Sequence, residues 1–212
     1  MTVGGRSVRS VTMTYADDEW YRDITSFARD SPSWLQLTAE IGTEAGILVF
    51  GLLFVAAWWR VRGGDPRAVA VACLAPVATA VAYVVSEVLK TFFDQDRPCR
   101  TVAGAVAPLV ECPEAGDWSF PSNHATIAGA SAVTVALAWR AMVWLTVPLA
   151  LLLAFSRVFV GVHFPHDVAV GLLLGAAVGL LAVRAGTGPA TRVLSAGRHR
   201  RGQRTRGRRT RG

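Results

Sequence analysis

The stretch IGTEAGILVFGLLFVAAWW, from Ile41 to Trp59, contains a single charged residue, Glu44. A helix needs about 20 mostly apolar residues to cross a bilayer, so this stretch predicts a membrane-spanning helix. Inside hydrocarbon, backbone polar groups have no water to bond to, and a helix satisfies them within its own segment. The stretch therefore favours an all-α fold embedded in a membrane.

Four more apolar runs follow the first, at residues 68–89, 124–139, 142–162 and 168–183. Hydrophobic residues make up 52% of the 212 residues and charged residues only 17%, which is low for a soluble domain. In the last run, Gly171, Gly175 and Gly179 have the spacing that predicts close packing between helices. We therefore expect one integral-membrane helical bundle with about five transmembrane helices.

The segment before the first run predicts a different kind of helix. Between Asp17 and Arg29, apolar residues recur at helical spacing while charged residues fall on other faces. This pattern is typical of an amphipathic helix at a membrane interface, and a helix packed on the rest of the protein explains it equally well. Residues 1–16 predict a disordered N-terminus, and the first 40 residues lack the apolar region of a cleavable signal peptide.

The positive charge of the sequence belongs to its C-terminal end. The formal net charge is +7, yet nine arginines and no acidic residue follow Thr191, so the rest of the chain sums to −2. We expect residues 188–212 to form a disordered Arg/Gly-rich tail that helps to set the orientation, and residues 17–187 to form the membrane domain. Such a tail also suits anionic lipid headgroups, and we expect no specific nucleic-acid partner.

The distribution of arginine also predicts which side of the membrane each loop faces. Three arginines lie between the first two runs, and Arg140 lies between the third and the fourth. Together with the tail they define one face, which the positive-inside rule makes cytoplasmic. The N-terminal segment, the loop 90–123 and the turn 163–166 then face outward, as expected for a multi-pass protein of a bacterial-type plasma membrane.

Three short polar segments fall on that outer face. The first runs from Lys90 to Pro98, the second from Phe120 to His124 and the third from Ser156 to Asp167. A single lysine or arginine at a helix end often only reaches for the interface, and a single histidine is usually structural. Ionisable groups at membrane depth are costly and usually functional, so their gathering on one face predicts a site.

The charges of these segments predict phosphate binding. Lys90, Arg97 and Arg157 supply three cations, of which arginine suits two-point binding of a phosphate and lysine acts as a point charge. Ser122 and Asn123 stand at the predicted start of a helix, where backbone N–H groups and the helix dipole favour an anion. Such a set also stabilises the charge that spreads over a phosphoryl group in the transition state.

Two histidines have the arrangement expected for phosphoryl transfer. His163 precedes Asp167 by four residues, so the carboxylate can hold one ring nitrogen protonated and leave the other free to attack. His124 is then the candidate for the general acid that protonates the departing oxygen and later activates water. His166 lacks a carboxylate four residues downstream, and we interpret it as a helix-terminus residue. We expect neither a metal nor a cofactor.

The order and spacing of the three segments resemble the signature of the type 2 phosphatidic acid phosphatase superfamily. The segment from Lys90 matches K-x6-R-P, the segment from Pro121 is similar to P-S-G-H, and the segment from Ser156 matches S-R-x5-H-x3-D. Within the superfamily the sequence looks most like the bacterial undecaprenyl-diphosphate phosphatases. The resemblance implies metal-independent hydrolysis through a phosphohistidine. It also implies the site residues: His163, His124 and Asp167 in catalysis, and Lys90, Arg97, Ser122 and Arg157 in phosphate binding.

The sequence departs from the superfamily pattern in two places. Asn123 stands where glycine is usual, and asparagine tolerates a left-handed backbone, so the turn survives while the side chain narrows the pocket. Five predicted spans stand where the superfamily usually has six helices, and the segment 17–29 is a candidate for the missing one.

Several other residues near the motifs have open roles. Glu87, three residues before Lys90, predicts either a local ion pair or an orienting contact. Asp94 and Asp96 lie beside Arg97 and are predicted to orient it. Glu40 and Glu44 share a helix face without an assigned role. A separate feature is the polar loop bracketed by two cysteines, which predicts a disulfide between Cys99 and Cys112 if the loop faces an oxidising compartment.

The position of the site at helix ends predicts a lipid substrate, which can slide in sideways with its phosphate reaching the cations. Three cations suit a polyprenyl diphosphate, and a phosphatidic-acid or phosphatidylglycerophosphate type lipid is the alternative. A haloperoxidase would hold vanadate in the same pocket, but such relatives are soluble. A small transporter or channel would explain the spans, but not a nucleophile, an acid and three phosphate ligands in this order.

Overall fold

The computed structural model describes residues 8–209, with side chains from residue 16 to residue 198. The elements follow in the order α1 (Val8–Asp30), α2 (Ser33–Val61), α3 (Pro66–Phe93), α4 (Pro98–Thr101), α5 (Asn123–Ala138), the 3-10 helix η1 (Arg140–Met142), α6 (Val143–Phe159) and α7 (Pro165–Arg209). No strand occurs among the described residues. The predicted all-α fold is confirmed.

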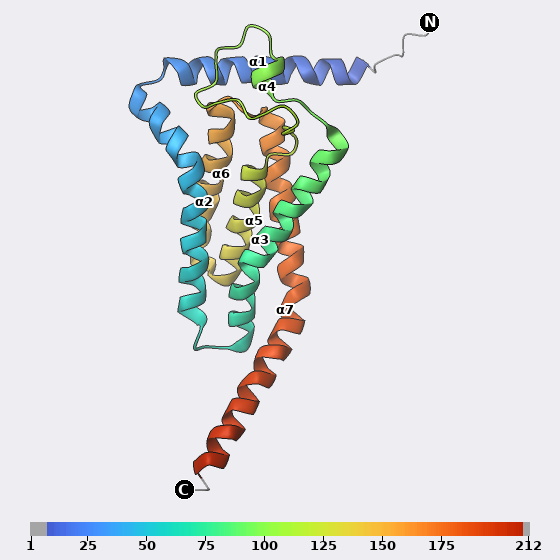
Figure 1. The fold of residues 1–212 in the computed structure, drawn as a ribbon. Coiled ribbons are helices and arrows are strands. Elements are labelled where there is room, and N and C mark those ends of the chain that lie inside the picture. The colour runs from blue at the N-terminus through green and yellow to red at the C-terminus, as the bar shows by residue number, and fades with distance from the viewer. Residues whose placement is uncertain (1–7, 210–212) are drawn as a thin grey trace, which may run out of the picture.

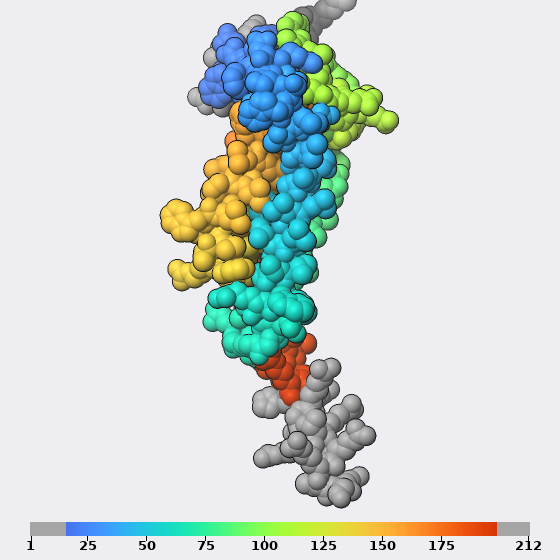
Figure 2. Space-filling view, turned by 90° about the vertical axis from the view of Figure 1, so that its left-hand side faces the viewer, coloured from blue at the N-terminus to red at the C-terminus, as the bar shows by residue number. Residues whose placement is uncertain are grey.

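The long helices form a bundle with one helix lying across its end (Figure 1). Helices α2, α3, α5, α6 and α7 run along the bundle, and α1 crosses one end of it. Helix α5 lies at the centre, where it packs against α2, α3, α6 and α7. Figure 2 shows α2 and α6 side by side on one face of the molecule, under α1.

Four stretches are long and apolar enough to cross a membrane, namely Ser33–Val61, Pro66–Thr101, Arg140–Phe159 and Pro165–Arg198. They correspond to four of the five predicted spans. The remaining one, α5, has 16 residues and is about 24 Å long, against about 30 Å of hydrocarbon in a bilayer. Because other helices pack around α5, it is a short central helix of the bundle. The predicted helical membrane bundle is confirmed.

Small residues let α5 and α7 approach until their backbones touch. A Cβ atom added at Gly175 would lie 1.9 Å from the carbonyl oxygen of Thr126, and one at Gly171 would lie 2.6 Å from that of Ser122. On the facing helix, a Cβ at Gly129 would lie 2.2 Å from the carbonyl oxygen of Leu172. The predicted close packing along the last span is present, and it places the start of α7 against the start of α5.

Helix α1 is longer than predicted and is packed on the protein. It begins at Val8 and not at Asp17, so residues 8–16 of the predicted disordered N-terminus are helical, while residues 1–7 lie outside the described part. Tyr21 is fully buried, and its hydroxyl donates to the carbonyl oxygen of Gly161 at 2.8 Å. The exposed side chains of Trp20 and Phe27 lie on another face of α1 and suit the predicted interfacial position.

Helix α7 continues past residue 188, where the sequence predicts a disordered tail, and ends at Arg209. Arginine has high helix propensity and is the commonest residue of this segment, although Pro189 and three glycines lie inside it. The structure therefore marks no boundary at residue 188. Residues 210–212 of the predicted tail lie outside the described part of the chain.

Candidate active site

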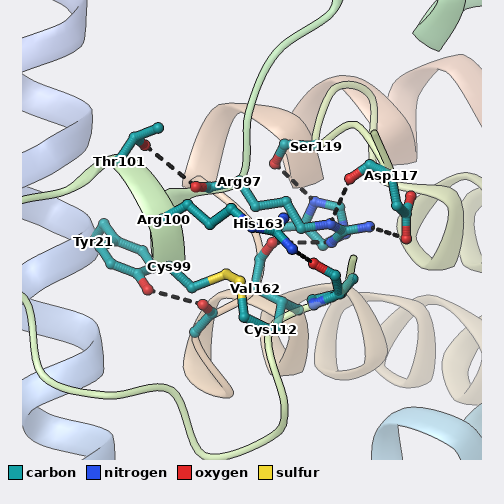
Figure 3. The surroundings of a disulfide bond; sticks show 12 residues. Tyr21, Arg97, Cys99, Arg100, Thr101, Cys112, Asp117, Ser119, Val162 and His163 are labelled. Carbon is teal, nitrogen blue, oxygen red and sulfur yellow. Dashed lines mark hydrogen bonds and ion pairs between the residues drawn. A yellow bond between two sulfur atoms is a disulfide. The ribbon is translucent and has the colours of Figure 1, made fainter. Parts of the chain in front are cut away.

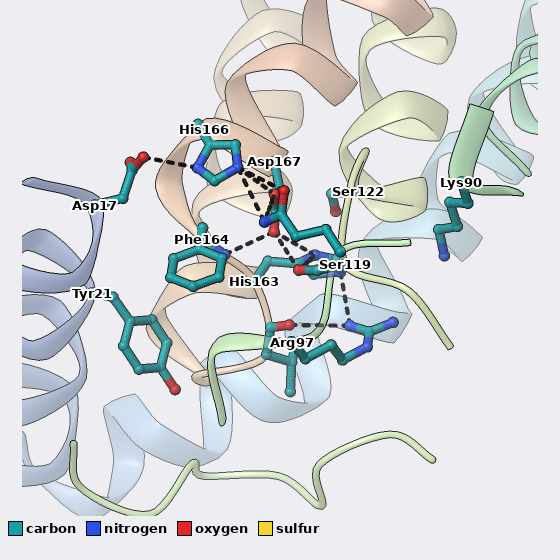
Figure 4. A network of polar contacts seen from close by, with 12 residues as sticks. Asp17, Tyr21, Lys90, Arg97, Ser119, Ser122, His163, Phe164, His166 and Asp167 are labelled. Carbon is teal, nitrogen blue, oxygen red and sulfur yellow. Dashed lines mark hydrogen bonds and ion pairs between the residues drawn. The ribbon is translucent and has the colours of Figure 1, made fainter. Parts of the chain in front are cut away.

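The predicted site residues gather at the end of the bundle that α1 crosses (Figure 4). Lys90 lies in the last turn of α3 and Arg157 near the end of α6. The turn between α6 and α7 carries His163, and the first turn of α7 carries Asp167. Because neighbouring helices end or begin at this level, segments far apart in the sequence place their polar side chains together.

The candidate nucleophile and its carboxylate are both deeply buried. His163 is 2% exposed and Asp167 is 0% exposed. Nδ1 of His163 lies 3.4 Å from Oδ2 of Asp167, and Nε2 lies 3.1 Å from Nη1 of Arg97. A carboxylate beside Nδ1 favours the tautomer that carries its proton there, and the unprotonated Nε2 then accepts a hydrogen bond from Nη1 of Arg97.

Burial controls the charge of the candidate nucleophile. Desolvation lowers the pKa of His163 to about 4, although the hydrogen bond to Asp167 acts in the opposite direction. His163 is therefore neutral near pH 7. A neutral imidazole is the form that can attack phosphorus.

Asp167 is held by more partners than the sequence predicted. Its Oδ2 accepts from the backbone N–H of Phe164 at 2.9 Å and from the hydroxyl of Ser119. Its Oδ1 accepts from Nε2 of Gln95 at 3.1 Å. A buried carboxylate is stable only with such bonds, so Ser119 and Gln95 belong to the site. The sequence did not indicate either residue, because both are uncharged and neither stands at a position that the three motifs specify.

His166 is also part of this network (Figure 4). Its Nε2 lies 3.0 Å from Oδ1 of Asp167, and its Nδ1 lies 3.0 Å from Oδ2 of Asp17 in α1. The ring packs between Phe120 and Phe164, with centroid distances of 5.7 Å and 5.5 Å. His166 stands in the first turn of α7, as predicted for a helix-terminus residue, and it additionally links α1 to the carboxylate of Asp167.

Two of the predicted phosphate ligands share one carboxylate. Nζ of Lys90 lies 3.3 Å from Oδ1 of Asp117, and Nη2 of Arg97 lies 3.0 Å from Oδ2. Arg97 also donates from Nε to the backbone oxygen of Asp117 at 2.9 Å and from Nη1 to that of Val162 at 3.1 Å. Burial raises the pKa of Asp117, but the charges of Arg97 and Lys90 outweigh it and hold the pKa below its ordinary value.

The predicted role of Asp94 and Asp96 is wrong. Both are exposed, and the contacts to Arg97 come from Asp117, which is twenty residues away in the sequence. Asp94 ends α3 with a left-handed backbone (φ 43°), and its amide donates to the carbonyl of Lys90 at 3.3 Å. The chain direction changes at this residue, so closeness in sequence does not bring the carboxylate to the guanidinium. Glu87 lies 3.5 Å from Nζ of Lys90, which is the predicted local ion pair.

His124 and Arg157 face a carboxylate of α2. Nε2 of His124 lies 3.1 Å from Oε1 of Glu44, and Nη1 of Arg157 lies 4.0 Å from the same oxygen. Nη1 of Arg157 also donates to the hydroxyl of Thr43 at 2.9 Å. Glu44, which the sequence left without a role, is therefore the neighbour of the candidate general acid.

Two atoms of the predicted phosphate ligands, Oγ of Ser122 and Nε of Arg157, are buried and have no hydrogen-bond partner among the described residues. Ser122 is the N-cap residue of α5, where a serine hydroxyl usually accepts from a backbone N–H of the first turn, yet it makes no such bond. Buried polar groups normally have a partner. Both atoms are therefore available to bind a phosphoryl group.

The side chain of Asn123, which was expected to narrow the pocket, forms hydrogen bonds to residues of α3. Its Oδ1 accepts from the hydroxyl of Ser86 at 2.7 Å, and its Nδ2 donates to Glu87. It is the first residue of α5, and the non-glycine residue with positive φ among the described residues is Asp94. Asn123 needs no left-handed backbone here. Its amide side chain bonds to α3, so the contribution left for phosphate binding is the backbone N–H at the start of α5.

The predicted disulfide between Cys99 and Cys112 is present (Figure 3). It joins α4 to the loop that precedes α5, and this loop carries both Asp117 and Ser119. Arg97 stands two residues before Cys99, as the N-cap of α4. The crosslink therefore ties the segment of a phosphate-binding cation to the segment of its carboxylate.

Comparisons with known proteins agree with this geometry. A model of the PAP2 superfamily matches residues 71–188. The chain is 39% identical over 119 residues to an undecaprenyl-diphosphatase of Sulfolobus acidocaldarius, covering 55% of this chain and 56% of that protein. It is 33% identical over 144 residues to undecaprenyl-diphosphatase BcrC of Bacillus subtilis, covering 67% of this chain and 70% of that protein.

A solved structure shows the same fold. The PAP2-type phosphatidylglycerolphosphate phosphatase of Bacillus subtilis aligns with a TM-score of 0.61 and 21% identity, over 81% of this chain and 84% of that chain. The chain belongs to the PAP2 superfamily. The resemblance predicted from three short motifs is thus confirmed, and the names of the two relatives support a lipid phosphate hydrolase.

Proposed function

We propose that this protein hydrolyses the terminal phosphate of a membrane lipid. The observation that carries the proposal is the buried pair of His163 and Asp167, in which the unprotonated Nε2 of His163 lies 3.1 Å from Nη1 of Arg97. A neutral imidazole beside a phosphate-binding cation is what nucleophilic phosphoryl transfer requires. Membership of the PAP2 superfamily and the names of the relatives support the same activity.

In the first step, Nε2 of His163 attacks phosphorus. A nitrogen–phosphorus bond forms while the bond between phosphorus and the leaving oxygen breaks, and His124 donates a proton to that oxygen. Asp167 stabilises the positive charge that the imidazole gains. The phosphoryl oxygens are bound by the side chains of Lys90, Arg97, Ser122 and Arg157 and by the backbone N–H of Asn123.

In the second step, water hydrolyses the phosphohistidine. His124, which has lost its proton, takes one from water as the water oxygen attacks phosphorus. The nitrogen–phosphorus bond breaks, neutral His163 is restored, and inorganic phosphate leaves. The three cations neutralise the charge on the phosphoryl oxygens throughout, so the mechanism runs without a metal ion.

The substrate that we propose is a polyprenyl diphosphate, which becomes the monophosphate. The names of the two relatives and the three cations support this choice. A phosphatidic-acid or phosphatidylglycerophosphate type lipid is the second candidate, and the name of the structural neighbour favours it. We further propose that residues 17–187 form the catalytic unit with its site on the outer face. The C-terminal segment then lies in the cytoplasm near anionic headgroups.

A panel assay in detergent tests the proposal. Phosphate release is measured from polyprenyl diphosphate, polyprenyl phosphate, phosphatidate and phosphatidylglycerophosphate. We expect fastest release from polyprenyl diphosphate and a loss on the order of 10³-fold or more in His163→Ala, since the nucleophile is gone. His199→Ala, which removes a histidine from the arginine-rich segment, serves as the matched control and should equal wild type.

Each result separates two candidates. Full activity of His163→Ala would rule out the phosphohistidine mechanism. Faster release from phosphatidate or phosphatidylglycerophosphate would make the second substrate class the correct one. No release from any of the four lipids by folded protein would favour a transporter or channel.

A further inference from the structure

The carboxylate of Asp117 lies where a ligand phosphate is expected. Its two oxygens each contact one cation, Oδ1 at 3.3 Å from Nζ of Lys90 and Oδ2 at 3.0 Å from Nη2 of Arg97. The side chains of Lys90 and Arg97 are 7% and 5% exposed, whereas that of Asp117 is 48% exposed. An acidic side chain thus reaches from a loop onto two buried cations and bridges them as two phosphoryl oxygens would.

The other cations of the site also have carboxylate neighbours. Lys90 has a second partner in Glu87 at 3.5 Å, and Arg157 lies 4.0 Å from Glu44. Three phosphate-binding cations therefore face three partly exposed carboxylates. Asp167 is not one of these, because its bonds are to other groups. An anion that binds at these cations has to compete with a negative charge that the protein itself supplies.

The loop around Asp117 lets its side chain leave without disturbing the cations. Glu114, Ala115 and Gly116 before it are exposed, so the carboxylate can turn into solvent without burying its charge. Arg97 keeps its hydrogen bonds to the backbone oxygens of Asp117 and Val162, at 2.9 Å and 3.1 Å, because these do not involve the carboxylate. The guanidinium stays oriented when the side chain moves.

We infer that Asp117 is an internal counter-ion that selects phosphate monoesters and terminal phosphates over phosphate diesters. This inference rests on the proposed function, because it takes a lipid phosphate as the ligand. A diester carries one negative charge, so it only replaces the charge of the Asp117 carboxylate. A monoester carries a charge of about −1.5 to −2 at pH 7, so it is attracted to the two cations more strongly than the carboxylate is. Most headgroups in a phospholipid bilayer are diesters, so a site open to the membrane needs such discrimination.

A purely positioning role for Asp117 predicts the opposite result. If the carboxylate served only to orient Lys90 and Arg97, removing it would weaken the binding of every anion. If it is a counter-ion, removing it strengthens anion binding, and it does so most for singly charged anions. The direction of the change therefore decides between the two roles.

Calorimetric titration of the full-length protein in detergent measures this direction as a change in affinity. The probes are methyl phosphate, a monoester, and dimethyl phosphate, a diester. We expect wild type to bind methyl phosphate at least about tenfold more tightly than dimethyl phosphate. Asp117→Asn should bind methyl phosphate about threefold to fivefold more tightly than wild type and should gain the larger increase for dimethyl phosphate.

Two controls complete the experiment. Glu111→Gln removes an exposed carboxylate from the same loop and should leave both affinities unchanged, which excludes a general effect of net charge. Asp117→Ser is titrated in parallel, and thermal unfolding of both variants checks that they fold. If neither variant folds, the wild-type affinity ratio decides, and equal affinities for the two probes overturn the inference.

Unchanged or weaker binding of both probes by Asp117→Asn would also overturn it. Failure of the proposed function is a separate result. If the protein releases phosphate from no lipid but shows the expected titrations, the counter-ion role of Asp117 is supported and the proposed hydrolase activity is rejected. If the protein hydrolyses lipid phosphates but binds both probes equally, the hydrolase activity is supported and the counter-ion role of Asp117 is rejected.

Discussion

The two sides of the site hold their charges in different ways. On one side, Asp167 is 0% exposed and accepts bonds from Ser119, Gln95 and the backbone of Phe164, besides contacting His163. On the other side, the buried cations contact carboxylates that solvent reaches, such as Asp117. In the mechanism that we propose, bonds within the protein hold His163 in its reactive tautomer before any ligand arrives, whereas a ligand phosphate replaces the carboxylate partners of the cations. We therefore assign the first side to reaction and the second to binding.

The largest expected effect comes from the reactive side. Asp167→Asn keeps the shape of the carboxylate but presents an amide to Nδ1 of His163, which favours the wrong tautomer. We expect kcat to fall on the order of 10³-fold with KM little changed, since the phosphate ligands are intact. Phosphate release under saturating lipid measures the loss. A variant within tenfold of wild type would mean that Asp167 does not orient the nucleophile.

A smaller effect is expected from the binding side. Arg157→Lys keeps the positive charge but removes the unpartnered Nε and the forked geometry of the guanidinium. A hydrogen bond to a charged group contributes about 1.5–3 kcal/mol, so kcat/KM should fall about 10-fold to 100-fold, mainly through KM. Steady-state kinetics on the best lipid of the panel separate the two constants. A loss in kcat alone would show that Arg157 acts in the transition state only.

The pH dependence gives the smallest effect near neutral pH and concerns the side that carries His163. Because the pKa of His163 is lowered to about 4, kcat/KM should fall about tenfold per pH unit only below about pH 4. Between this value and the ordinary value of 6.5, the unfolded chain binds a proton that the folded chain does not. Stability should therefore fall as the pH falls through this window. Thermal unfolding and initial rates at several pH values measure both trends, and an acid limb centred near 6.5 would contradict the buried state of His163.

Much of the site was predictable from the sequence because its residues lie in segments with strong local patterns. His163 and Asp167 are four residues apart, and Ser122 and Asn123 stand at the start of a helix, so their positions could be predicted from spacing alone. The apolar runs likewise predicted the long helices. The prediction for the last span succeeded because glycines at every fourth position leave room for a neighbouring backbone.

The contacts that the sequence did not reveal join residues far apart in the chain, and two of the three residues concerned lie in a loop. Asp117, Ser119 and Glu44 contact residues twenty or more positions away, and no periodic pattern marks them. Asp94 and Asp96 were chosen because they neighbour Arg97 in sequence, but the chain turns at Asp94 and directs them to solvent. A loop has no repeating geometry from which the partner of a side chain can be inferred.

By itself, the sequence determined that the chain is helical and lies in a membrane, because long apolar runs must satisfy their backbone groups internally. It also predicted the chemistry that we propose for the site, because three motifs carry a histidine–aspartate pair and three cations. The sequence also predicted the local pair of Glu87 and Lys90, but the tertiary structure alone decided that Asp117 and Glu44 stand against those cations. Ion pairs depend on distances of a few ångströms in space, and these distances follow from how the loop before α5 folds back under its disulfide onto the ends of α3 and α6.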